Sequence, residues 1–130
     1  MKRKHKANEY LMQGNLRPGK PSGCFTFTEV SSDESSPDEG FLVSISDSTS
    51  ANVGSFRILP YSDGSTVYFY AFEISPELRG HGCGTTVFSA IKAHLYDLGY
   101  RRILLQVSRS NQPAFHLYKN SGLHVIKSSK

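Results

Sequence analysis

The alternation of apolar and polar residues predicts four β-strands in the first part of the chain. Residues 24–30 (CFTFTEV) alternate as a half-buried strand does. Three more runs rich in β-branched and aromatic residues follow at 41–46, 52–59 and 67–74, and turn-rich links separate them. Because short links join neighbouring strands, we expect these four strands to pair antiparallel in succession.

Helical spacing of the apolar residues replaces this alternation after residue 84. It predicts a helix over residues 85–98 and a second helix over residues 111–122. Between them, the continuous apolar run of residues 101–108 predicts a buried strand that lies parallel to the 67–74 strand. Residues 123–127 predict a last short strand. The order of these elements indicates an α/β fold with a mixed sheet.

The first 22 residues have the weakest pattern. Residues 4–12 favour a short helix, and residues 13–23 contain Gly and Pro that predict irregular structure. Residues 31–40 carry four acids and no core-forming residue, which predicts a loop. We therefore divide the chain into an N-terminal segment, residues 1–22, and a single domain, residues 23–130.

Length and composition narrow the class of protein. A chain of 130 residues suits one domain that folds without disulfides or metal. Cys24 and Cys83 lack metal-ligand spacing, and the five histidines form no metal motif, so we expect reduced thiols and no metal. No apolar run approaches the roughly 20 residues that span a bilayer, and no export signal follows the basic start. The sequence predicts a soluble, cytoplasmic protein without membrane contact.

Charge divides the chain into three blocks. The formal net charge is +4 over residues 1–30, −7 over residues 31–78 and +7 over residues 79–130. The basic last block suits an anionic ligand, and the acidic block suits a cationic second partner, although solvated surface explains both more simply. The basic start lacks interleaved aromatic residues, so we favour a solvated tail over a nucleic-acid contact.

A glycine-rich stretch, RGHGCG at residues 79–84, connects the 67–74 strand to the 85–98 helix. Glycine lets a ligand approach bare backbone N–H groups, and a helix start places the positive end of its dipole behind them. This pattern predicts a phosphate-bearing ligand. The alternative is a tight strand-to-helix turn with no ligand.

Two common phosphate loops fit this stretch poorly. A P-loop requires a lysine directly after its last glycine, whereas Thr85 and Thr86 follow Gly84. A dinucleotide-binding loop requires a third glycine where Thr85 stands, and an acid where the next strand offers Gln106. The first is excluded and the second is weakly supported.

Two motifs resemble those of the GNAT acetyltransferase superfamily. Residues 74–91 (ISPELRGHGCGTTVFSAI) resemble its acyl-CoA-binding signature, with Arg79, Gly82 and Gly84 at the signature positions. Residues 111–123 (NQPAFHLYKNSGL) have the spacing of its second motif, although Leu replaces the usual Phe at the end. The motifs occur in family order with the expected strand between them.

The resemblance covers residues 41–126 and implies the GNAT acyl-CoA N-acyltransferase fold, an antiparallel meander followed by β-α-β-α-β. Members of the family begin with a strand and two helices that wall the substrate site, and they close with a seventh strand. This sequence offers only residues 1–22 and one possible strand before the meander, and it stops four residues after Ile126. We expect a helper chain or an exchanged strand to complete the sheet, and the 123–127 strand to form an exposed edge where a homodimer assembles.

The resemblance also implies an N-acetyltransferase that transfers an acetyl group from acetyl-CoA to a primary amine, on a small molecule or a peptide, by direct attack. The alternative is a non-catalytic acyl-CoA sensor or regulatory module with a reduced fold. The residues expected to hold acetyl-CoA are Ile74, Arg79, Gly80, His81, Gly82, Cys83, Gly84, Thr85 and Asn111.

Two residues are candidates for catalysis. Tyr118 matches the family's general acid, which would protonate the leaving sulfur, although a core tyrosine would show the same pattern. Glu73 is a candidate base for the amine, although strand alternation also allows it to point to solvent. A thioester at Cys83 is a further route, but no His or Asp partner accompanies it, so direct transfer is preferred. Asn111 would contact the pantetheine arm or simply cap its helix.

Overall fold

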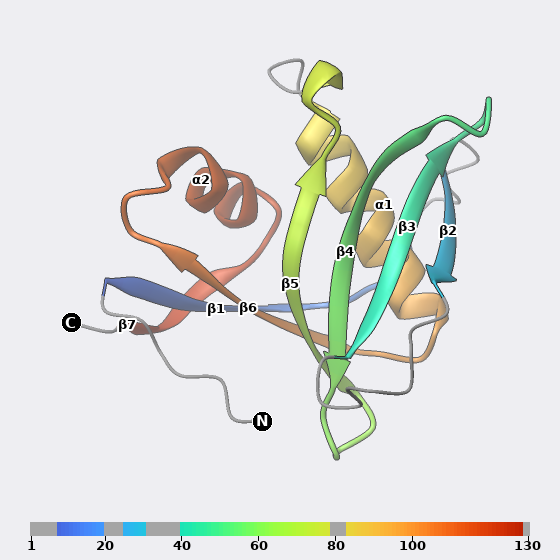
Figure 1. Cartoon of the computed structure of the whole chain (residues 1–130). Coiled ribbons are helices and arrows are strands. Elements are labelled where there is room, and N and C mark those ends of the chain that lie inside the picture. Colours follow the sequence, from blue (N-terminus) through green and yellow to red (C-terminus); the bar gives the residue numbers. More distant parts are fainter. Residues whose placement is uncertain (1–7, 20–24, 31–39, 79–82, 129–130) are drawn as a thin grey trace.

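The computed structural model describes residues 8–19, 25–30, 40–78 and 83–128, which form one mixed sheet and its helices (Figure 1). The strands lie in the order β2, β3, β4, β5, β6, β1, β7. Their bounds are β1 (Glu9–Asn15), β2 (Phe25–Val30), β3 (Phe41–Asp47), β4 (Asn52–Pro60), β5 (Thr66–Ile74), β6 (Arg102–Ser108) and β7 (His124–Ser128). The helices are α1 (Cys83–Asp97), α2 (Gln112–Asn120) and the short 3-10 helix η2 (Pro76–Leu78).

Strands β2 to β5 form the antiparallel meander that the sequence predicts. Each strand pairs antiparallel with the next one along the chain. In the turn after β3, the Asp47 carboxylate accepts hydrogen bonds from the backbone N–H groups of Thr49 and Ala51, at 2.8 and 3.0 Å. Asp63 plays the same part in the turn between β4 and β5. These Asp side chains satisfy backbone donors that the turns leave unpaired.

The parallel pairing of β5 with β6 is also confirmed, and α1 connects the two strands. Their pairing extends over three residue pairs only, from Thr66 with Arg102 to Tyr68 with Leu104. Both predicted helices are present, and each is followed by a glycine with positive φ, Gly99 at 108° and Gly122 at 97°. Glycine adopts this backbone conformation without steric cost, which explains why the helices stop there.

The N-terminal segment differs from the expectation, because β1 is a strand where a short helix and irregular chain were predicted. It lies between β6 and β7 and pairs antiparallel with both. Met12 and Leu16 are buried on the helix-covered face of the sheet, and Tyr10 packs on Phe115 of α2 at 5.0 Å between ring centroids. Period-two burial therefore overrides the weak helix propensity, and the chain supplies from its own start the strand that we expected another chain to contribute.

Both helices pack on one face of the sheet, where the hydrophobic core lies. In Figure 1, α1 lies behind β3 and β4, and α2 lies beside β5 and β6. The ring of Phe88 on α1 contacts Phe69 on β5 and Tyr118 on α2, with centroid distances of 5.4 and 5.1 Å. None of the described helices covers the opposite face, which carries partly exposed side chains such as Tyr68 and Tyr70.

Strand β7 lies at one end of the strand order, so the expectation of an edge strand there is confirmed. Val125 and Ile126 on β7 are 38% and 46% exposed. Apolar side chains on an unpaired edge favour pairing with another chain, and the homodimer stays a prediction. None of the described helices combines the length and the apolar character that crossing a membrane requires.

The burial of Met12 predicts that β1 is an integral part of the fold. Replacing this fully buried side chain, as in Met12→Ala, should lower the free energy of unfolding by about 2–5 kcal/mol. The matched control is Gln13→Ala, on the other face of the same strand, which should cost less than about 1 kcal/mol. Urea unfolding followed by circular dichroism measures both, and equal small losses would contradict the placement of β1.

Candidate functional site

The divergence of β5 from β6 creates the candidate site. Beyond Tyr68 the two strands no longer pair, and Ala71 on β5 has a φ of 55°, in the left-handed region. The register between β4 and β5 shifts at the same place, between Ser55 and Arg57. A non-glycine residue in this conformation costs roughly 1–2 kcal/mol, so surrounding pairing must hold the bulge in place. The bulge bends the end of β5 away from β6 and opens the sheet there.

Gly54 on β4 allows the backbone to pass close to the end of β5. A Cβ atom at Gly54 would lie 2.1 Å from the carbonyl oxygen of Glu73, which no side chain tolerates. Sequence reasoning missed this residue, although a glycine inside a strand pattern is a signal of close backbone approach. It also missed the hydrogen bond from the Tyr68 hydroxyl to the Gln106 side chain, 2.9 Å long, which joins β5 and β6 where they begin to separate.

The start of α1 lies close to the end of β5 and to α2 at Gly84. A Cβ atom added there would contact Ile74 of β5 and Leu117 of α2, at 3.7 and 3.8 Å. The structure thus brings the end of β5, the start of α1 and the face of α2 together. Thr85 is exposed in the first turn of α1, which contains no acidic residue. A helix start without acids retains its attraction for an anion.

Four predicted ligands of the cofactor lie outside the described residues. They are Arg79, Gly80, His81 and Gly82, and the side chain of Cys83 is outside too. Asn111, by contrast, is confirmed as the N-cap of α2, where its side-chain oxygen accepts a hydrogen bond of 3.2 Å from the backbone N–H of Ala114. Asn111 is exposed, so capping does not bury its amide.

Tyr118 is the most perturbed titratable group described. Its side chain is 9% exposed, and burial raises the pKa of its hydroxyl to about 12. Within the described part of the chain, no hydrogen bond to this hydroxyl is present. A buried phenol in this environment keeps its proton at neutral pH and can donate it or share it with a nearby anion.

Glu73 lies on the opposite face from Tyr118. Its neighbours Phe72 and Ile74 belong to the helix-covered face, and Glu73 itself is exposed. Alternation along β5 therefore directs its carboxylate to the face that no described helix covers. The two candidate catalytic residues therefore lie on opposite faces of the sheet.

Comparison with known proteins decides the family. The model of the acetyltransferase (GNAT) family matches residues 9–123. The chain belongs to this family. Over 53 residues it is 40% identical to a mycothiol acetyltransferase from Geodermatophilus obscurus. This matched stretch covers 41% of this chain and 17% of that enzyme.

Solved structures of GNAT proteins share the fold. A GCN5-related N-acetyltransferase from Sphaerobacter thermophilus superposes with a TM-score of 0.60 at 17% identity, over 90% of this chain and 48% of that one. One from Kribbella flavida gives a TM-score of 0.59 at 18% identity, over 89% of this chain and 53% of that one. This GNAT chain thus spans about half the length of these structures and less than a fifth of the curated relative.

No metal ligand set accompanies the site among the residues that the structure describes. Groups of three or more His, Cys, Asp or Glu side chains able to hold an ion do not occur there. The candidate site consists of backbone N–H groups, a buried phenol, an exposed carboxylate and apolar walls. This set can bind an anionic ligand and move a proton at each side of the opening.

The raised pKa of Tyr118 predicts how stability changes at alkaline pH. The unfolded chain ionises this phenol near its ordinary pKa of about 10 and the folded chain near about 12, so stability is full below about pH 10 and falls as pH rises towards 12. From about pH 9 to about pH 11, Tyr118 should contribute a loss of about 1.3 kcal/mol. Urea unfolding of the native protein and of Tyr118→Phe measures it, and an identical loss in both would contradict the burial of the hydroxyl.

Proposed function

We propose that this GNAT protein is an N-acetyltransferase that transfers the acetyl group of acetyl-CoA to a primary amine by direct attack. The observation that carries the proposal is the opening between two adjacent parallel strands, with a helix start and its glycine at one end. A ligand strand with amide groups pairs with exposed backbone at such an opening, and a phosphate binds the N–H groups at the helix start.

The residues present fit an acyl-CoA thioester. Gly84 leaves space between Ile74 and Leu117, and the first turn of α1 presents N–H groups that have no partner within a helix. We assign the pyrophosphate to the N–H groups of residues 79–85, and the pantetheine arm to the backbone around Ile74 and to Asn111. When bound, the thioester supplies the activated acetyl group.

The reaction requires two proton transfers, one on each side of the thioester. The amine nitrogen forms a bond to the carbonyl carbon, the C–S bond breaks, and the amine loses a proton. Glu73 accepts that proton, directly or through water, from the face that no described helix covers. Tyr118, on the helix-covered face, donates a hydrogen bond from its hydroxyl to the leaving sulfur. A base and an acid on opposite faces suit a nucleophile that enters from one side while the leaving group departs on the other.

The pKa of Tyr118 limits what this residue does. A thiol in water has a pKa of about 8.5, so complete proton transfer from a phenol at about 12 is uphill unless burial raises the pKa of the thiol as well. Tyr118 therefore acts first as a hydrogen-bond donor to the negative charge that develops on sulfur. Such donation is strongest in a site that excludes water, and the aromatic wall of Phe88 provides this exclusion.

The experiment that tests the function is an assay of free CoA release with a panel of amines, comprising polyamines, peptide N-termini, lysine peptides and aminoglycosides. We expect release with at least one of these classes. Acetyl-CoA binding without turnover on any amine would instead support the sensor or regulatory module. Failure to bind acetyl-CoA in calorimetry would overturn both.

Substitution of Gly84 should separate binding of the donor from folding. Gly84→Glu places bulk and negative charge in the gap between Ile74 and Leu117, so the affinity for acetyl-CoA should fall about 100-fold or more. Gly84→Ala adds only a methyl group at ordinary contact distance and should weaken binding less without lowering stability. Calorimetry and urea unfolding measure the two effects, and tight binding by Gly84→Glu would remove the helix start from the site.

Substitution of Tyr118 should lower the rate without removing the donor. Tyr118→Phe keeps the ring that packs on Phe88 and deletes the hydroxyl, so turnover should fall by about two orders of magnitude. The affinity for acetyl-CoA should stay within about twofold of the native value, because the hydroxyl acts on the charge that develops during reaction. Steady-state kinetics and calorimetry measure both quantities, and unchanged turnover would exclude Tyr118 from catalysis.

A further inference from the structure

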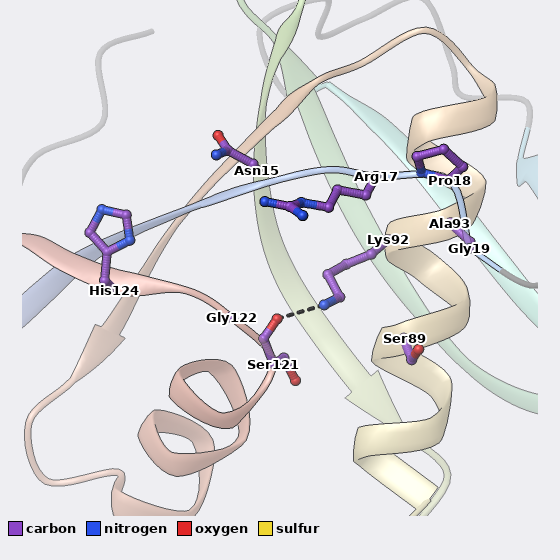
Figure 2. Close-up of a pocket in the computed structure, with 10 residues that line it drawn as sticks. All are labelled: Asn15, Arg17, Pro18, Gly19, Ser89, Lys92, Ala93, Ser121, Gly122 and His124. Carbon is purple, nitrogen blue, oxygen red and sulfur yellow. Dashed lines mark hydrogen bonds between the residues drawn. The ribbon is translucent and has the colours of Figure 1, made fainter.

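A cavity lies on the helix-covered side of the sheet, beside α1 and the turn that follows α2. It has a volume of about 420 Å³, and three elements enclose it: the chain at the end of β1, the middle of α1 and the turn between α2 and β7 (Figure 2). The polar residues of its lining are Asn15, Arg17, Ser89, Lys92, Ser121 and His124. The size is that of a small-molecule site.

The charge of this lining is of one sign. Arg17 and Lys92 are cations, and the described lining contains no Asp or Glu. Figure 2 shows that the side chains of Arg17 and Lys92 both point into the space between α1 and the turn after α2. Two cations that face one concave space both attract an anion placed there.

Lys92 is the stronger part of the argument because it is half-buried. Burial lowers the pKa of its ammonium group, which reflects the cost of holding a charge away from water. Its Nζ donates a 2.6 Å hydrogen bond to the backbone carbonyl of Ser121, and among the described residues no carboxylate pairs with it. The bond to the Ser121 carbonyl uses one of the three N–H groups of the Lys92 ammonium, so two remain for a ligand. Arg17 adds the five N–H groups of its guanidinium.

Arginine and lysine together with an amide and a hydroxyl are the donors that bind phosphate groups. A cavity of this volume holds more than one phosphate ion, and Pro18 and Ala93 add uncharged surface for an organic part. We infer that this cavity is a binding site for a small phosphate monoester, with Arg17 and Lys92 holding the phosphate group and Asn15 and Ser89 adjacent donors.

This site is separate from the proposed donor site. Lys92 lies eight residues after Gly84 on α1, which places it about 12 Å further along the helix. Arg17 comes from the chain that follows β1, and β1 pairs with β6 on the side away from β5. The inference therefore does not depend on the acetyltransferase activity, and a measurement of phosphate binding tests it separately.

The test is a titration of the full-length, ¹⁵N-labelled protein with inorganic phosphate and with glycerol 3-phosphate, at constant ionic strength set by sodium chloride. We expect saturable shifts of the amide signals of Ser89, Lys92 and Ser121 in ¹H–¹⁵N spectra with both probes. Arg17→Gln, at an exposed position, should weaken binding about tenfold, because a charge-assisted contact is lost. Lys127→Gln, which removes a cation outside the cavity, should leave it unchanged.

Lys92→Gln serves as a second variant, for which we expect the same loss of phosphate affinity. If Lys92→Gln does not fold, the affinity of Arg17→Gln alone tests the site. Absence of shifts at these amides, or equal affinity in Arg17→Gln and the native protein, would overturn the site. Binding of phosphate without binding of glycerol 3-phosphate would overturn the inference that the ligand is a phosphate monoester. The titration is repeated with saturating CoA, and unchanged affinity is expected. Loss of phosphate binding under that condition would assign the cavity to the donor site and overturn its independence.

Discussion

The separation of β5 from β6 is the constraint on which the rest of the structure depends. Three residue pairs join the strands at one end, and the bulge at Ala71 ends any further pairing. Unpaired backbone in a sheet is costly unless a partner satisfies it, so an opening of this kind must be held by its surroundings. Gly54 allows β4 to support the bent end of β5, and α1 and α2 meet over the opening at Gly84.

The outer strands keep this opening in place. Because β1 pairs with both β6 and β7, it ties the second half of the sheet together without extending the meander. The same segment continues to Leu16, whose backbone N–H donates to the carbonyl of Arg101 at 2.8 Å, directly before β6. β6 is thus fixed along its length on the side away from β5. A rigid β6 and a bent β5 together give the opening a defined width.

Sequence patterns predicted the elements that depend on local signals. The four meander strands, both helices and the Asn111 cap were recognisable because period-two or helical spacing, turn residues and capping residues all lie within a few positions. The strand β1 was missed because YLMQGN has only two alternating core positions and its partners in β6 and β7 lie about 90 to 120 residues away. The bulge at Ala71 and the cavity at Lys92 depend on tertiary packing, and no local spacing reports them.

The arrangement of the candidate site follows from the unequal cover of the two faces of the sheet. On one face, α1 and α2 bury Phe88 and Tyr118, and this burial raises the pKa of the phenol above its ordinary value. On the other face, Glu73 is exposed, so its carboxylate remains in contact with water. One strand carries the boundary between these environments, because alternation along β5 sends adjacent side chains to opposite faces. A water-accessible carboxylate and a buried phenol therefore lie on opposite faces of one sheet, and the sheet itself separates them.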